Sequence, residues 1–303
     1  MESFYKMLNI QLGQLIGLAV GGWAYWRGYI TDKNRDALVQ IVLQLFMPAL
    51  IIHSFANITS EMMVLGGQVL IASTIIYGVQ AIGAGFLYRD FSDKNQALFH
   101  YATLVNNAGL GGQPLSYMMF GDPGSLLAAI YLIPHRLFMW SYGLKILQQG
   151  NSEHGNIWLK ILKNPSVIAV GIGILRVLLD IQFPEFIDLG LNNMGRAVSP
   201  MAAVIIGSIM ATIKPQQLLE RGVLRYTVIR LFIIPLIVLM ITRLLALDST
   251  LAGVLVIMTA MPAGTTTALL AEQYGLDENL AAKIMFVTTS LSIITVPLMV
   301  ALI

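Results

Sequence analysis

The sequence NNAGLGGQP at residues 106–114 decides the fold, because it interrupts an apolar stretch that runs from residue 96 to residue 120. Glycine and proline weaken the interior of a helix, and the side-chain amides of Asn106, Asn107 and Gln113 need hydrogen-bond partners. Inside a bilayer such backbone is tolerated only where protein or a water-filled cavity surrounds it. The stretch therefore predicts a broken helix in the interior of a membrane protein.

A second interruption, MPAGTTT at residues 261–267, follows about half a chain later. Two broken helices at corresponding positions of two halves are typical of the binding site of a secondary transporter. We therefore expect the two interruptions to contribute to one site.

The composition indicates a single membrane domain. Hydrophobic residues make up 56% of the chain and charged residues 11%, with a mean hydropathy of +0.74, whereas a soluble domain carries about 25% charged residues. The absence of cysteine excludes disulfides and thiolate-bound metals. The net charge of +2 gives no indication of nucleic acid as a partner. Residues 1–8 lack the pattern of a signal peptide, so we expect the first apolar stretch to be retained.

Apolar stretches long enough to span a bilayer contain about 20 residues. Ten are predicted, at residues 9–26, 37–56, 63–88, 96–120, 125–147, 165–181, 187–212, 224–245, 250–274 and 280–303. The longest connection lies between the fifth and sixth, so we divide the chain into halves at 1–150 and 151–303.

Basic residues in the connections predict the orientation. Only Lys6 and Arg243 fall on one side, which makes that side the outer one and places both termini outside the cytoplasm. The other side holds Arg27, Lys33, Arg35, Arg89, Lys94, Lys145, Lys160, Lys163, Lys214, Arg221, Arg225 and Lys283. The chain is thus predicted to be a multi-pass protein of the plasma membrane, such as a bacterial inner membrane.

The two halves are predicted to be inverted repeats. Five spans is an odd number, so the second half enters the membrane from the opposite side. Weak self-similarity agrees with this, since Phe120-Gly121 and Tyr274-Gly275 are separated by 154 residues, and Ala128 and Ala282 keep the same offset.

The chain resembles the auxin efflux carrier family, which includes bacterial malate and malonate permeases and the plant PIN carriers. The resemblance covers nearly the whole chain, and its most specific parts are NNAGLGGQP followed by YMMFGD, the segment YLIPHRLFMWSYG, and MPAGTTTALLAEQYG. It implies an all-α integral membrane protein with an NhaA-like fold, in which broken helices 4 and 9 cross near the midplane. It also implies a scaffold of helices 1, 2, 6 and 7, often dimeric, and a moving transport domain of helices 3–5 and 8–10.

The same resemblance assigns residues within the two breaks. Asn107 and Pro114 match the family's asparagine and crossover proline in the fourth helix, while Pro262 and Gly264 match the proline and glycine that open the ninth-helix break. Plant members have a second proline where this chain has Thr267, so the detailed geometry of the second crossing is not carried over from them.

The distribution of charge predicts an anionic substrate. All sixteen Asp and Glu residues fall in connections or near the ends of predicted spans. Charges at the centre of a span cost several kcal/mol to insert and tend to be functional. Arg136, near the middle of its span, is therefore the leading candidate, because a guanidinium can hold a carboxylate through two hydrogen bonds. The alternative is that Arg136 pairs only with the helix-end carbonyls of the broken segments.

Backbone N–H groups at the restarts of the broken helices, near Gly112 and Gln113 and near Gly264 and Thr265, also favour anions. Asn106, Asn107, Gln113, Thr265, Thr266 and Thr267 can add hydrogen bonds to a substrate, or can instead satisfy the exposed backbone of the breaks.

Other intramembrane residues have simpler interpretations. Arg176 and Arg230 are expected to snorkel towards span ends, whereas Arg196 can line the scaffold side of the cavity. The glycines Gly13, Gly17 and Gly21 predict close helix packing, or else a dimer contact. The acidic residues Asp180, Glu185 and Asp188 are expected to be solvated in an outer loop.

These patterns predict a secondary transporter of a small organic anion, with malate-like or malonate-like substrates implied by the resemblance and an auxin-like acid as a further possibility. The alternatives are sodium-coupled symport with a cation at the crossover, and a membrane receptor that senses a substrate without transport. The sequence has no nucleophile, acid–base pair or metal set at depth, so we expect neither an enzyme nor a bound cofactor or metal. The expected partners are the organic anion, the bilayer and a second copy of the chain bound through the scaffold helices.

Overall fold

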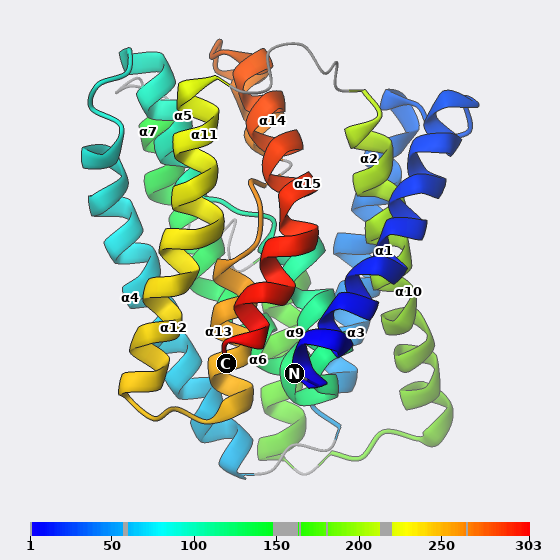
Figure 1. Cartoon of the computed structure of the whole chain (residues 1–303). Helices are drawn as coiled ribbons and strands as arrows, with labels where there is room; N and C mark the ends of the chain where they lie inside the picture. Colours follow the sequence, from blue (N-terminus) through cyan, green and yellow to red (C-terminus); the bar gives the residue numbers. More distant parts are fainter. Residues whose placement is uncertain are drawn as a thin grey trace.

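The computed structural model spans residues 1–303 and describes all of them except residues 1, 57–59, 148–162, 164, 180, 213–219 and 265. In this described part every element is a helix (Figure 1). The predicted boundary between the halves, at residue 150, lies outside it. The first half contains α1 (Glu2–Trp26), α2 (Asp32–Ile41), η1 (Val42–Phe46), α3 (Met47–Ser54), α4 (Ser60–Leu87), α5 (Asp93–Leu104), η2 (Ala108–Gly112), α6 (Gln113–Phe138), η3 (Met139–Gly143) and α7 (Leu144–Leu147).

The second half contains α9 (Pro165–Leu178), α10 (Glu185–Met210), α11 (Arg221–Val228), η4 (Ile229–Ile233), α12 (Ile234–Leu244), α13 (Ser249–Thr259), α14 (Thr266–Gln273) and α15 (Glu278–Ala301). The segments η1 to η4 are π-helical and join the α-helices on either side of them, except that η2 begins after the break that follows α5. Each predicted apolar stretch contains one helix or a run of consecutive helices.

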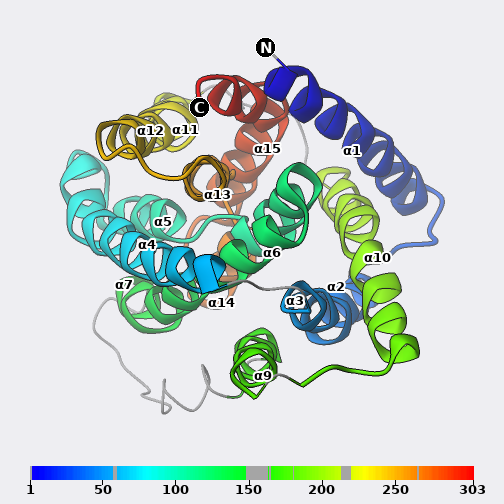
Figure 2. The same ribbon diagram turned by 90° about the horizontal axis from the view of Figure 1, so that it is seen from below.

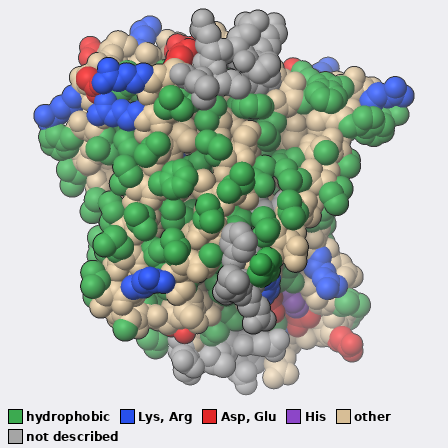
Figure 3. Space-filling view, in the orientation of Figure 1, with side chains coloured by type: hydrophobic (Ala, Val, Ile, Leu, Met, Phe, Trp, Pro, Cys, Tyr) green, Lys and Arg blue, Asp and Glu red, His purple; other side chains and the backbone are tan. Residues whose placement is uncertain are grey.

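Four helical runs are long and apolar enough to cross a membrane by their length and composition, namely Asp32–Ser54, Met62–Leu87, Arg221–Leu244 and Glu278–Ala301. The outer surfaces agree with a lipid environment. Apolar side chains such as Ile16, Trp26 and Ile82 are 69%, 76% and 70% exposed. Figure 3 shows hydrophobic side chains over the middle of one face, with Lys and Arg gathered nearer its two ends.

Helix α6 contains a turn at Gly121, whose φ of 68° and ψ of −148° lie outside helical values. A residue with a Cβ is strained at this positive φ. The turn separates a first arm, which begins at Gln113, from a longer second arm that ends at Phe138. It falls between the predicted stretches 96–120 and 125–147.

The helices pack as two groups, seen end-on in Figure 2. The first group, α1, α2 with η1 and α3, α9 and α10, packs around buried residues that include Val42, Leu50, Phe55 and Val198. The second group, α4 to α7 and α11 to α15, encloses a separate cluster that includes Tyr77, Leu132, Val254 and Ile284. Helix α6 contacts both groups and lies at their boundary.

Helices α1 and α10 approach so closely that glycine is required at the contact. A Cβ built on Gly21 would lie 2.0 Å from the carbonyl oxygen of Val204, and one on Gly207 would lie 2.0 Å from that of Leu18. A Cβ on Gly17 would lie 2.6 Å from the Cβ of Ala203. Close packing, the first interpretation of the glycine stripe, is therefore confirmed. The dimer interpretation is wrong for Gly17 and Gly21, because α10 of the same chain covers them.

We expect Gly21→Ala to destabilise the fold by about 1–3 kcal/mol, because the added methyl group overlaps a backbone oxygen that only a helix shift can move. The matched control is Gly13→Ala on the same helix, where no atom of the described residues lies within 4 Å of the added carbon. Thermal unfolding of the purified protein in detergent measures both. Equal melting temperatures for the two variants would contradict the packing described.

Candidate functional site

The two predicted interruptions meet inside the bundle. Helix α5 ends at Leu104 and η2 begins at Ala108, while α13 ends at Thr259 and α14 begins at Thr266. The Asn107 N–H donates a hydrogen bond of 2.9 Å to the Pro262 carbonyl, and the Gly264 N–H donates one of 3.2 Å to the Val105 carbonyl. These bonds form an antiparallel bridge between Asn106 and Ala263. Figure 1 shows both non-helical links about halfway along the bundle, so the predicted breaks and their contact are confirmed.

Arg230, from η4, holds this crossing together. Its guanidinium donates three hydrogen bonds of 2.9 Å, from Nε to the Met261 carbonyl, from Nη1 to the Thr103 carbonyl and from Nη2 to the Thr259 carbonyl. The side chain is 1% exposed, so the prediction that it snorkels is wrong. The physical reason is that α5 and α13 both end here, and their last carbonyls lack helical partners and carry the negative ends of the helix dipoles.

Arg230 therefore neutralises the carboxyl ends of both broken helices. The amino-terminal ends of η2 and α14, which carry partial positive charge, have no such counterpart, since no Asp or Glu among the described residues lines the adjoining cavity. The restarts of the two helices therefore present backbone N–H groups and partial positive charge, which favour a bound anion.

A cavity of about 270 Å³ adjoins the crossing. Its walls come from the crossing itself, from the second arm of α6 and from α2 with η1. The lining residues are Gln40, Leu43, Gln44, Val105, Asn106, Asn107, Gly109, Leu110, Leu132, His135, Arg136, Met139, Pro165, Gly264 and Thr266. We call it the crossover cavity. Its polar groups are amides, a hydroxyl, an imidazole and one guanidinium.

Arg136 supplies the positive charge of the crossover cavity. Its Nη2 donates a 3.4 Å hydrogen bond to Ser166 Oγ. None of the four ion pairs formed among the described residues includes Arg136. The alternative prediction, that Arg136 pairs with the ends of the broken helices, is wrong for the described structure, because Arg230 takes that role.

A family model described as "Membrane transport protein" matches residues 10–300. The chain belongs to this family. The membrane transport protein family is the auxin efflux carrier family that the sequence resembles, and membership makes the chain a multi-pass membrane protein.

Two archaeal proteins are similar to this membrane transport protein over nearly their full lengths. An uncharacterized transporter of Methanocaldococcus jannaschii is 23% identical over 96% of this chain and 97% of its own. An uncharacterized transporter of Methanothermobacter thermautotrophicus is 24% identical over 89% of this chain and 90% of its own. Their names give transport as the activity and no substrate.

The four π-helical segments of this transporter's described part all lie at the crossing or the crossover cavity. Leu43 and Gln44 of η1, Gly109 and Leu110 of η2, and Met139 of η3 line the cavity, and η4 carries Arg230. π-helical turns are rare and occur frequently at functional sites. Their gathering here supports this region as the functional site.

Gln40 and Gln44 are cavity residues that sequence reasoning missed. They lie one helical turn apart, and Gln44 Nε2 donates a hydrogen bond to Gln40 Oε1. The available signal was a pair of amides at i and i+4 near the start of an apolar stretch, a spacing that places them on one helix face.

The two asparagines of the break differ in their environment. Asn106 Nδ2 donates a 2.6 Å hydrogen bond to the Met258 carbonyl, and the side chain is 3% exposed. Asn107 makes no capping bond to η2, and it lines both the crossover cavity and a smaller cavity beyond the crossing. Asn106 therefore joins the two broken helices, whereas Asn107 borders the two cavities.

We expect Asn107→Ala to weaken the apparent affinity for the transported solute by about 3- to 10-fold, the value of one neutral hydrogen bond, without lowering the melting temperature. Asn106→Ala should instead lower the melting temperature, because it leaves the Met258 carbonyl without its partner. Concentration-dependent uptake into liposomes and thermal unfolding separate the two effects. An unchanged affinity in Asn107→Ala would remove that residue from the site.

The remaining predicted residues lie in several places. Gly264 and Thr266 line the crossover cavity, Pro262 lines the smaller cavity, and Pro114 lines a larger one. Gly112 packs against Met258, since a Cβ there would lie 2.8 Å from the sulfur. Gln113 and Thr267 are buried, and within the described part their side-chain polar atoms have no hydrogen-bond partner. Thr265 lies outside the described residues.

Arg176 belongs to a separate ion pair. Its Nη1 and Nη2 donate hydrogen bonds of 2.8 and 2.6 Å to the two carboxylate oxygens of Asp188, and its guanidinium carbon lies 4.3 Å from the ring centroid of Phe183. The predictions that Arg176 snorkels and that Asp188 is simply solvated are therefore wrong. Asp180 lies outside the described residues.

Proposed function

We propose that this protein is a secondary transporter that moves a small organic anion, such as malate, malonate or an auxin-like acid, across the plasma membrane. The observation that carries the proposal is the crossover cavity, where Arg136 has no ion-pair partner among the described residues and two helix restarts add positive charge. A carboxylate would accept two hydrogen bonds from the guanidinium and complete the charge balance of the cavity.

Transport would proceed by an elevator type of alternating access. The first helix group, equivalent to predicted helices 1, 2, 6 and 7, would be the scaffold, and the second group would carry the crossing past it. The separate hydrophobic clusters of the two groups support this division. The crossover cavity lies between them, since Gln40 and Gln44 belong to the first group and Arg136 to the second.

The inverted five-helix repeats, 1–150 and 151–303, belong to the same proposal. Gly121 and Gly275, which the sequence offset relates, both adopt positive φ angles, of 68° and 64°. Each follows the restarted half of a broken helix, at equivalent points of the two halves. Dimerisation through the scaffold helices also remains part of the proposal.

Sodium-coupled symport is the less favoured alternative. The carbonyls freed by the breaks, which a cation would use, include those of Thr103, Thr259 and Met261 that accept hydrogen bonds from Arg230. A sodium ion there would be repelled by the guanidinium. We therefore expect anion transport to persist in sodium-free buffer.

The test is uptake of labelled malonate, malate and indole-3-acetate by purified protein in liposomes, with glycerol and a cationic amine as controls. The proposal expects saturable flux of at least one acid and none of the controls. Flux of the cation alone would overturn it. Binding of an acid without flux would favour the receptor alternative.

A further inference from the structure

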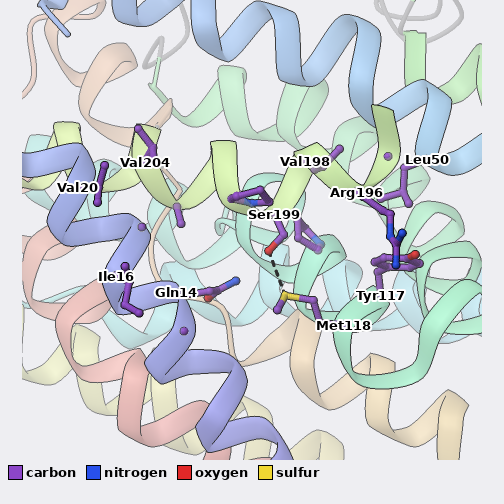
Figure 4. Close-up of a pocket in the computed structure, with 16 residues that line it drawn as sticks. Gln14, Ile16, Val20, Leu50, Tyr117, Met118, Arg196, Val198, Ser199 and Val204 are labelled. Carbon is purple, nitrogen blue, oxygen red and sulfur yellow. Dashed lines mark hydrogen bonds between the residues drawn. The ribbon is translucent and has the colours of Figure 1, made fainter. Parts of the chain in front are cut away.

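A larger cavity, of about 570 Å³, lies between α1, α10 and the first arm of α6. Figure 4 shows side chains from these helices that line it, and Leu50 of α3 lies near Arg196. Most of its lining is apolar, as at Ile16, Val20 and Val204. The polar side chains are those of Gln14, Tyr117, Arg196 and Ser199. We call it the outer-arm cavity, after the first arm of α6.

Arg196 is the charged residue of the outer-arm cavity. It is the twelfth residue of α10, which places it about 16 Å along the helix from Glu185. Its side chain is exposed, and it takes part in none of the ion pairs formed among the described residues. Figure 4 shows its guanidinium beside the ring of Tyr117.

The intramembrane arginines of the described part thus divide into two kinds. Arg176 binds Asp188, and Arg230 binds three backbone carbonyls. Arg136 and Arg196 have no anionic partner among the described residues, and each lines a cavity. An unpaired charge within a predicted span is costly, which makes both residues candidates for a functional role.

A small cavity of about 50 Å³ shares lining residues with both the crossover cavity and the outer-arm cavity. Asn107 and Leu110 line both it and the crossover cavity, while Gln14 and Ala203 line both it and the outer-arm cavity. The small cavity therefore lies between the crossover cavity and the outer-arm cavity. Leu110, which is 6% exposed, forms the apolar wall between the crossover cavity and the small cavity.

We propose that the outer-arm cavity is a second binding station for the transported carboxylate, with Arg196 as its anion contact and Leu110 as the barrier between the stations. This inference rests on the proposed function and adds a site to it. The guanidinium of Arg196 would hold the carboxylate through two hydrogen bonds. The apolar walls would contact the rest of the solute. A small movement at Leu110 would open the crossover cavity to the small cavity, which Gln14 and Ala203 border on the side of the outer-arm cavity.

The absence of cysteine in the chain permits a direct test, because Ser199→Cys introduces a single thiol beside Arg196. The rate of thiol modification by a small water-soluble methanethiosulfonate would be measured in lipid nanodiscs, with malonate or indole-3-acetate against chloride at equal ionic strength. We expect at least one of the acids to slow the modification several-fold. Adding Arg196→Gln should raise the half-protecting concentration by about 10-fold or more, and Arg196→Lys should have a smaller effect.

Two further variants separate this inference from the proposed function. Gln44→Cys reports on the crossover cavity, and Tyr29→Cys, on an exposed turn, controls for general effects of the acid on the reagent. Protection of Gln44→Cys without protection of Ser199→Cys would overturn the second station and leave the proposed function standing. Protection of Ser199→Cys that persists in Arg196→Gln would also overturn it. Protection at neither cysteine, without flux, would overturn both.

Discussion

Replacing Arg136 with glutamine is expected to lower the transport efficiency for the organic acid by about 10- to 100-fold, because charge-assisted hydrogen bonds contribute about 1.5–3 kcal/mol to binding. The transport efficiency of Arg136→Lys should lie between those of the unmodified protein and of Arg136→Gln, since an ammonium keeps the charge and loses the planar pair of donors. Initial rates of uptake into liposomes at several concentrations of the acid measure both variants.

The matched control for this prediction is Arg243→Gln. Arg243 is an exposed arginine near the end of α12, and its guanidinium donates a hydrogen bond to the Leu302 carbonyl away from the cavities. Uptake by this variant should match that of the unmodified protein. Unchanged kinetics in both Arg136 variants would rule out contact between Arg136 and the substrate.

Replacing Arg230 with methionine is expected to destabilise the protein by about 3–5 kcal/mol, because each buried carbonyl left without a donor costs about 1–3 kcal/mol. The carbonyls of Thr103 in α5, Thr259 in α13 and Met261 in the second break would lose their donor together. The melting temperature in detergent should fall by about 10 °C, and the yield of monodisperse protein should fall with it. Arg230→Lys should be partly destabilised, because one ammonium cannot reach all three oxygens.

Arg243→Met serves as the control for Arg230→Met, since it removes an exposed arginine from the same helical run. Its melting temperature should stay within a degree or two of the original. If Arg230→Met melted at the temperature of this control, the crossing would not depend on the guanidinium.

The breaks were predictable because their residues carry local information. Gly109, Gly111, Gly112 and Pro114 disfavour continuous helix whatever their surroundings, and Pro262 and Gly264 do the same in the second half. Lipid then requires the freed backbone to be surrounded by protein. The meeting of the two breaks followed from these constraints together.

The role of Arg230 was not predictable from its position in the sequence. Its place in an apolar span is compatible with snorkelling as well as with an inward contact. The choice between them depends on Thr103, Thr259 and Met261. These carbonyls come close only after folding, and the π-helical segment η4 contains the arginine that reaches them. The pairing of Arg176 with Asp188 was missed for a similar reason, because the two lie on different helices.

The most direct measurement is an experimental structure, in a lipid nanodisc, with a transported acid bound. The predicted result is density for the acid in the crossover cavity, with its carboxylate against the Arg136 guanidinium and within reach of the Asn107 amide. A bound acid that touches neither residue, or a fourth helix that runs unbroken through residues 105–107, would contradict the proposal that the acid binds at the crossing of two broken helices.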